Sequence, residues 1–94
     1  MQVYITPRAE RNLDLIVDHL KNKWGEKTAK EFVQKVDEIF KLLENYPLIG
    51  QIEDHEIRGF QLSPQTRILY RIRDNKVIIL SFFDNRQDPK RKFN

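Results

Sequence analysis

Cysteine is absent from this sequence of 94 residues, and histidine occurs only at positions 19 and 55. A chain without cysteine has no disulfide framework, no thiolate nucleophile and no cysteine-based zinc site. Two isolated histidines argue against a histidine-rich metal site. No hydrophobic run approaches membrane-spanning length, and the first residues reach charge and proline too soon for a signal peptide. We therefore expect a cytoplasmic protein with no cofactor.

The composition is typical of a soluble globular protein. Hydrophobic residues make up 39% of the chain and charged residues 33%, which excludes a disordered polypeptide. The length allows one domain, residues 1–94, with a modest core.

Charge is divided unevenly along the chain. Residues 1–56 carry 8 Lys and Arg against 11 Asp and Glu, a net of −3, whereas residues 57–94 carry 9 against 3, a net of +6. Such a division indicates an acidic or polyanionic partner for the basic part. The alternative is that basic side chains only solvate an exposed sheet face.

Two amphipathic helices are predicted in the acidic part. Thr6 stands at an N-cap position and Pro7 suits the first helical position. The first apolar stripe comprises Ala9, Leu13, Ile16, Val17, Leu20 and Trp24. Gly25 is typical of a helix end. A second stripe, ending before "NYP", comprises Ala29, Phe32, Val33, Val36, Ile39, Phe40 and Leu43. So short a link predicts an antiparallel helical hairpin.

Strand-like runs lie on both sides of this hairpin. "QVYIT" precedes it, and residues 57–62, 67–73 and 76–83 follow it with short turns between them, which predicts an antiparallel meander. "PLIGQIEDHE" is expected to be a loop. The predicted fold is therefore α+β, a small antiparallel sheet packed against an N-terminal helical hairpin in the order β-αα-βββ.

The strand "RILYRIR" separates an apolar face from a basic face. Strand alternation predicts that Ile68, Tyr70 and Ile72 pack under the helices. The residues predicted to face solvent are Arg67, Leu69, Arg71 and Arg73. Positions on one face recur at roughly 7 Å, close to the spacing of phosphates along a nucleic-acid strand. These arginines either bind an anionic partner or protect the sheet and pair with carboxylates.

Two further features belong to the basic part. Strict alternation places Arg58 on the apolar face, so either Gly59 marks a bulge or Arg58 meets a carboxylate. After the last strand, "FFDNRQDPKRKFN" adds a basic cluster of Arg86, Lys90, Arg91 and Lys92. "EDHE" could supply a general base at His55, although a solvated loop is the more ordinary interpretation.

Several stretches together resemble the RelE/ParE superfamily of toxins from bacterial type II toxin–antitoxin systems. They are "ITPRAERNLDLIVDHLKNKWG", "FVQKVDEIFKLLENYPLIG", "IRGF", "RILYRI" and "VIILSFFDNR", which cover nearly the whole chain. The resemblance implies a cytoplasmic growth inhibitor with a role in plasmid stabilisation. It also implies a hetero-oligomer with a cognate antitoxin, which alone contacts operator DNA.

The resemblance implies two competing targets. RelE-like members cut mRNA on the ribosome without metal, using basic residues against the phosphates. ParE-like members bind and poison DNA gyrase. If this chain is RelE-like, Arg67 is the arginine at the scissile phosphate and Arg86 the basic position after the last strand, and these are its candidate catalytic residues.

Departures from the RelE-like pattern favour the ParE-like alternative. No tyrosine follows Arg86, the loop before the sheet is acidic, and no histidine ends the last strand. We therefore expect a ParE-like toxin that binds gyrase, with a RelE-like endonuclease as the alternative and an autoregulatory partner without toxicity as a third. The residues expected to contact the target or the antitoxin are Arg58, Arg71, Arg73, Arg86, Lys90 and Arg91.

Overall fold

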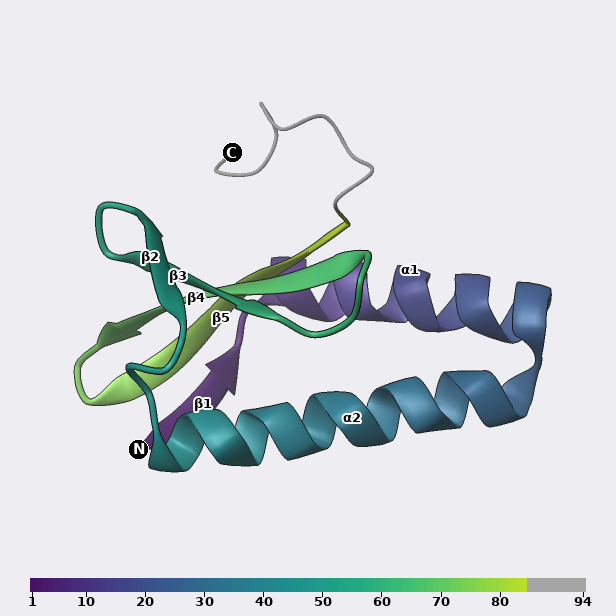
Figure 1. Cartoon of the computed structure of the whole chain (residues 1–94), viewed down its shortest axis with the longest axis horizontal. Helices are drawn as coiled ribbons and strands as arrows, with labels where there is room; N and C mark the ends of the chain where they lie inside the picture. Colours follow the sequence, from purple (N-terminus) through teal and green to yellow (C-terminus); the bar gives the residue numbers. More distant parts are fainter. Residues whose placement is uncertain (85–94) are drawn as a thin grey trace.

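A computed structural model describes residues 1–84, which form two helices and a five-stranded sheet (Figure 1). The elements, in chain order, are β1 (Gln2–Ile5), α1 (Pro7–Trp24), α2 (Glu26–Asn45), β2 (Gln51–Asp54), β3 (Ile57–Gln61), β4 (Thr66–Arg73) and β5 (Lys76–Asp84).

The helical hairpin begins and turns where the sequence predicts. The Thr6 hydroxyl accepts a hydrogen bond from the Ala9 amide at 3.1 Å, and Pro7 opens α1. Gly25 has a φ of 100°, a conformation that glycine adopts without steric strain, and its amide donates to the Lys21 carbonyl at 2.9 Å. Gly25 is therefore the single residue between α1 and α2.

The sheet has the order β1-β5-β4-β3-β2. Strands β3 to β5 pair antiparallel, which confirms the predicted three-stranded meander, and β2 adds a further antiparallel strand. The sheet is mixed and not antiparallel throughout as predicted, because β1 pairs parallel with β5. The loop prediction for "PLIGQIEDHE" is wrong for Gln51–Asp54, which forms the edge strand β2. This strand has one apolar residue, Ile52, which is 63% exposed. An edge strand that buries little of its side chains leaves no alternating pattern to detect.

The helices cover one face of the sheet and form the core with it. Ile68 and Tyr70 of β4 are fully buried there, as are Leu43 of α2 and Val77 and Ile79 of β5. The opposite side of the sheet is called the open face below. In register across it lie the pairs Gly59–Leu69, Gln61–Arg67 and Leu69–Ser81. Leu69 lies on this face, but the prediction that it faces solvent is wrong, because its exposed fraction is 2%.

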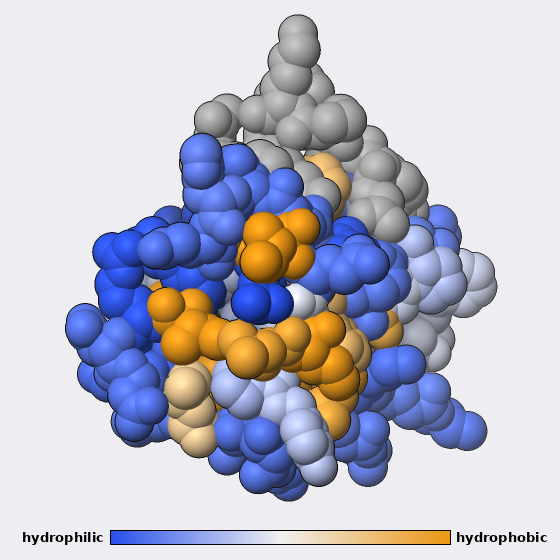
Figure 2. All heavy atoms as spheres, turned by 60° about the vertical axis from the view of Figure 1, so that its left-hand side comes forward, coloured by the Kyte–Doolittle hydropathy of each residue, from blue (hydrophilic) through white to orange (hydrophobic). Residues whose placement is uncertain are grey.

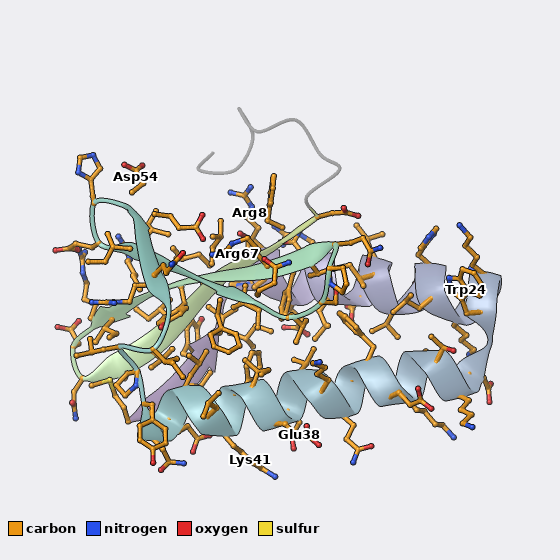
Figure 3. The ribbon with its side chains drawn as sticks, viewed as in Figure 1. Arg8, Trp24, Glu38, Lys41, Asp54 and Arg67 are labelled. Atoms are coloured by element: carbon orange, nitrogen blue, oxygen red, sulfur yellow. The ribbon has the colours of Figure 1, made fainter. Side chains whose placement is uncertain are left out.

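Trp24 does not belong to this core. The side chain is 64% exposed at the tip of the hairpin, well away from Arg67, which lies over the middle of the sheet (Figure 3). Lys23 Nζ lies 5.5 Å from the centre of the Trp24 ring. Its inclusion in the predicted buried stripe is wrong because the helices extend beyond the sheet at this end. Neither helix within residues 1–84 is both long and apolar enough to cross a membrane.

Candidate functional site

Arg67 is the most constrained charged residue of the open face. Its Nε donates to Glu53 Oε2 at 2.8 Å, its Nη2 lies 2.6 Å from the same oxygen, and its Nη1 donates to Gln61 Oε1 at 2.7 Å. The Arg67 side chain is 21% exposed and the Glu53 side chain 12%. Arg67 therefore lies on the predicted face but is held by internal acceptors and does not project freely into solvent.

A bulge in the edge strand brings Glu53 to this position. Ile52 pairs with Arg58, whereas Asp54 pairs with Ile57, so Glu53 is an extra residue between the two pairs. Gly59 then leaves space for the carboxylate, since a Cβ atom there would collide with the Glu53 carboxylate and lie 2.7 Å from Arg67 Nη2. The bulge and the glycine together set the carboxylate against the guanidinium.

The other arginines of β4 differ from Arg67 and from each other. Arg73 Nη2 pairs with Glu56 Oε2 at 2.9 Å, and the two side chains are 50% and 69% exposed. Arg71 makes no such pair: its Nε is buried and has no hydrogen-bond partner among residues 1–84. Because this nitrogen atom is buried, an anion from another molecule could meet Arg71 only at its terminal guanidinium nitrogen atoms.

Arg58 fits neither of the two predicted explanations. No register shift occurs at Gly59 in the β3–β4 pairing. Its Nη1 donates to backbone carbonyls, that of Gly50 at 2.8 Å and that of Leu48 at 3.2 Å. Carbonyl oxygens, not a carboxylate, therefore satisfy this guanidinium, and it stabilises the connection between α2 and β2.

Tyr70 holds the same connection from within the core. Its hydroxyl donates to the Pro47 carbonyl at 2.7 Å and accepts from the Gly50 amide at 2.9 Å. Gly50 is needed here because a Cβ atom would lie 2.6 Å from the Tyr70 hydroxyl and 2.9 Å from the Gly59 carbonyl. The sequence identified Tyr70 only as a core residue; the glycine after "YP" was the available signal for its second role.

Burial raises the pKa of the Tyr70 phenol above its ordinary value of 10.0, while the Gly50 hydrogen bond and the Arg58 charge act in the opposite direction. The folded protein therefore keeps a proton that the unfolded chain releases above about pH 10. This contribution to stability is complete below about pH 10 and is lost as the pH rises through the raised pKa.

We expect Tyr70→Phe to lower the free energy of unfolding by about 1–3 kcal/mol at neutral pH, because the buried Gly50 amide loses its acceptor. Above about pH 10 the difference from the wild type should shrink, because only the wild type must keep Tyr70 protonated. Urea unfolding across this pH range measures both effects. The matched control is Tyr46→Phe, where the side chain is 64% exposed and the change should stay within about 0.5 kcal/mol. A constant difference across the pH range would contradict the assignment.

Two surfaces other than the open face carry apolar groups. Figure 2 shows hydrophobic side chains gathered at the end of the molecule that carries β2; there Leu48 is 66% exposed, Ile49 47% and Ile52 63%. A groove of about 510 Å³ lies between the helical hairpin and the start of β4, with Leu15, Phe32 and Phe82 in its lining. Both surfaces are candidates for contact with another protein.

The remaining predicted site residues contribute less. His55 lies in the turn between β2 and β3, where its side chain is 91% exposed and only 3.5 Å from Asp54 Oδ1. Such an exposed histidine is typical of a solvated turn. Within residues 1–84, no three His, Asp or Glu side chains come together as metal ligands. Arg86, Lys90 and Arg91 lie outside the described residues.

Comparison with known proteins gave one family and several structures. The family model described as "ParE toxin of type II toxin-antitoxin system, parDE" matches residues 3–89. No curated protein sequence matches the chain. A structure of the chromosomal ParDE system from P. aeruginosa has a TM-score of 0.75 and 25% identity, and the match covers 89% of this chain and 95% of that one.

Two other solved structures share the fold at lower identity. The YoeB dimer from Staphylococcus aureus has a TM-score of 0.59 and 17% identity, with 86% of this chain and 92% of that one covered. A copper-bound mutant toxin from Helicobacter pylori has the same TM-score and identity, with 89% and 93% covered. At this identity the likeness extends to the fold alone.

Proposed function

Because the chain belongs to the ParE toxin family of type II toxin–antitoxin systems, we propose that it inhibits bacterial growth by binding DNA gyrase. A cognate antitoxin neutralises it in this proposal. The alternative is a RelE-like endonuclease that cuts mRNA on the ribosome.

The observation that carries the proposal is the state of Arg67. An enzyme that cleaves RNA without metal needs cationic donors directed at the phosphate and at the charge that develops during the reaction. All three nitrogen atoms of the Arg67 guanidinium are instead directed at Glu53 and Gln61. A guanidinium engaged in this way is not directed at a substrate. It therefore supports a toxin that acts by binding its target and not by cleaving RNA.

The positions of the candidate acid–base groups also favour target binding over RNA cleavage. Cleavage of RNA needs a group that accepts the 2′-hydroxyl proton and one that protonates the leaving oxygen. The two histidines of the described residues, His19 on α1 and His55 in the β2–β3 turn, are both exposed and lie on elements other than β4 and β5. Neither is in hydrogen-bond contact with Arg67. These positions give no support to the endonuclease alternative.

We propose that the antitoxin binds at Arg71 and in the groove beside the helical hairpin. The terminal nitrogen atoms of Arg71, whose Nε is buried and unbonded within residues 1–84, would bind an acidic side chain of the antitoxin, and the groove beside the hairpin can receive apolar side chains of a helix or strand. The resulting hetero-oligomer would contact operator DNA through the antitoxin. A gyrase target places the protein in the cytoplasm.

We expect tightly induced expression of the chain in bacteria to arrest growth, and co-expression of the neighbouring gene to restore it. The purified protein should block DNA supercoiling by gyrase with ribosomes absent, because binding to gyrase needs no translation. Supercoiling assays with and without purified antitoxin measure this directly, and added antitoxin serves as the control that restores activity.

Other outcomes assign other functions. Cleavage of mRNA within the ribosomal A site, with normal gyrase activity, would establish the endonuclease alternative. Benign expression together with tight antitoxin binding would leave an autoregulatory partner without toxicity.

A further inference from the structure

We infer that Glu53 determines which ligands the open face accepts: it fills the anion site of Arg67 and so keeps polynucleotide phosphates away from this surface. The inference rests on the proposed function, since it gives a reason why a toxin of this fold would not act on RNA. It also predicts that loss of one carboxylate creates a phosphate-binding surface.

The Arg67 guanidinium is already bound as it would be by an external anion. Its Nε and Nη2 both point at Glu53 Oε2, at 2.8 and 2.6 Å, and Gln61 accepts from Nη1. Arginine presents the same forked set of donors to carboxylates and to phosphates. A phosphodiester could therefore use these donors only after it had displaced the Glu53 carboxylate.

The local backbone favours retention of Glu53. The bulge in β2 places this residue between the two flanking pairs, and Gly59 provides the space in which the carboxylate lies. With the Glu53 side chain only 12% exposed, water screens the pair less than it would screen a pair on the surface. An intramolecular anion held in this way has a high effective concentration against any ligand in solution.

Removal of Glu53 would leave two cations on the open face. Arg71 lies four residues along β4 from Arg67 on the same side of the strand, roughly 13 Å away at the usual rise per residue. Its Nε is buried and has no hydrogen-bond partner within residues 1–84, so a phosphate would have to bind at its terminal guanidinium nitrogen atoms. Two such arginines can contact separate phosphates of one flexible single strand.

The test is binding of full-length protein to a fluorescent oligouridylate, measured by anisotropy over a range of salt concentrations. We expect Glu53→Ala to bind about tenfold more tightly than the wild type at low salt, which corresponds to one added charge-assisted contact. The dependence of log K on log salt should steepen by about 0.7, the value for one phosphate of a single strand. Glu53→Gln, which removes the charge but keeps an oxygen near Arg67, should show a smaller gain.

Matched controls separate this site from a general change in charge. Glu56→Ala removes the same charge from the exposed pair with Arg73 and should gain less than about threefold, because exposed pairs are weak and screened. Combining Glu53→Ala with Arg67→Ala should abolish the gain. Circular dichroism checks that each variant is folded, and Glu53→Gln serves as the readout if Glu53→Ala is not.

Two results would overturn the inference: equal gains in Glu53→Ala and Glu56→Ala, or a gain that survives Arg67→Ala. The supercoiling assay is independent of this one. A wild type that leaves gyrase untouched while Glu53→Ala gains RNA affinity would reject the proposed function alone. A wild type that blocks gyrase while Glu53→Ala gains nothing would reject the inference alone.

Discussion

Arg67→Ala is expected to lower the free energy of unfolding by about 2–4 kcal/mol, because it leaves the largely buried Glu53 carboxylate without its guanidinium. The estimate lies below the range for fully buried pairs since both side chains keep some contact with water. For a domain of this size the midpoint of thermal unfolding should fall by roughly 10–25 °C. Urea unfolding and calorimetry measure the two quantities.

A double-mutant cycle distinguishes the pair from the separate side chains. Replacing Glu53 and Arg67 together by Ala should be less destabilising than the sum of the two single changes, with a coupling of about 1–3 kcal/mol. Arg73→Ala is the matched control on the same strand and should cost less than about 1 kcal/mol, because its pair with Glu56 is exposed. If Arg67→Ala and Arg73→Ala lowered the free energy of unfolding equally little, the Glu53–Arg67 pair would not stabilise the fold.

This expectation changes how a toxicity assay of Arg67→Ala must be interpreted. A variant that has lost several kcal/mol of stability is present in cells at lower abundance, whatever its contacts with a target. Loss of growth arrest in Arg67→Ala would therefore identify a binding residue only if the double variant, with Glu53 also replaced, recovered stability without recovering toxicity.

Gly50→Ala is the second substitution with a large expected effect, about 3 kcal/mol of destabilisation. The added methyl group would lie 2.6 Å from the Tyr70 hydroxyl and 2.9 Å from the Gly59 carbonyl, and neither group can move freely. Tyr70 is fully buried, and Gly59 belongs to a paired strand. The loop must therefore shift, with loss of the hydrogen bonds to Tyr70 and Arg58. Thermal unfolding of the purified variant measures the effect.

Gly25→Ala provides the contrast for this substitution. Nothing lies within 4 Å of a Cβ atom at Gly25, so the cost there arises from the φ of 100° alone and should be about 1 kcal/mol. Because Gly50 does not have a positive φ, an equal cost at the two glycines would show that the loop relaxes around the added methyl group and that the contact with Tyr70 contributes little.

The helices and the core could be predicted because their signals are local. The Thr6–Pro7 cap and Gly25 act within one helical turn, and each helical stripe repeats with the period of the helix. The alternation of β4 likewise placed Ile68 and Tyr70 in the core and Arg67 on the opposite face. These predictions needed no knowledge of which strands are neighbours.

The candidate site depended on pairing that the sequence does not specify. Glu53 meets Arg67 only because β2 pairs with β3, contains a bulge at that position and crosses Gly59. A four-residue strand with one apolar residue carries too weak a pattern to predict such a register. By sequence alone the acidic stretch "EDHE" therefore predicts a solvated loop, and nothing in it distinguishes Glu53 from its neighbouring carboxylates.

The position of β1 has a consequence for synthesis of the protein. Within residues 1–84 this strand pairs only with β5, and the Thr6 hydroxyl donates to the Ile79 carbonyl, 73 positions later in the chain. At ordinary rates of translation roughly 4–15 s separate the appearance of these two partners. The nascent chain can form its helices early, but it cannot close the sheet until its last described strand has left the ribosome. The edge formed by β1 thus acquires its final form only after β5 has been synthesised, so a partner that recognises this edge cannot bind the nascent chain before that point.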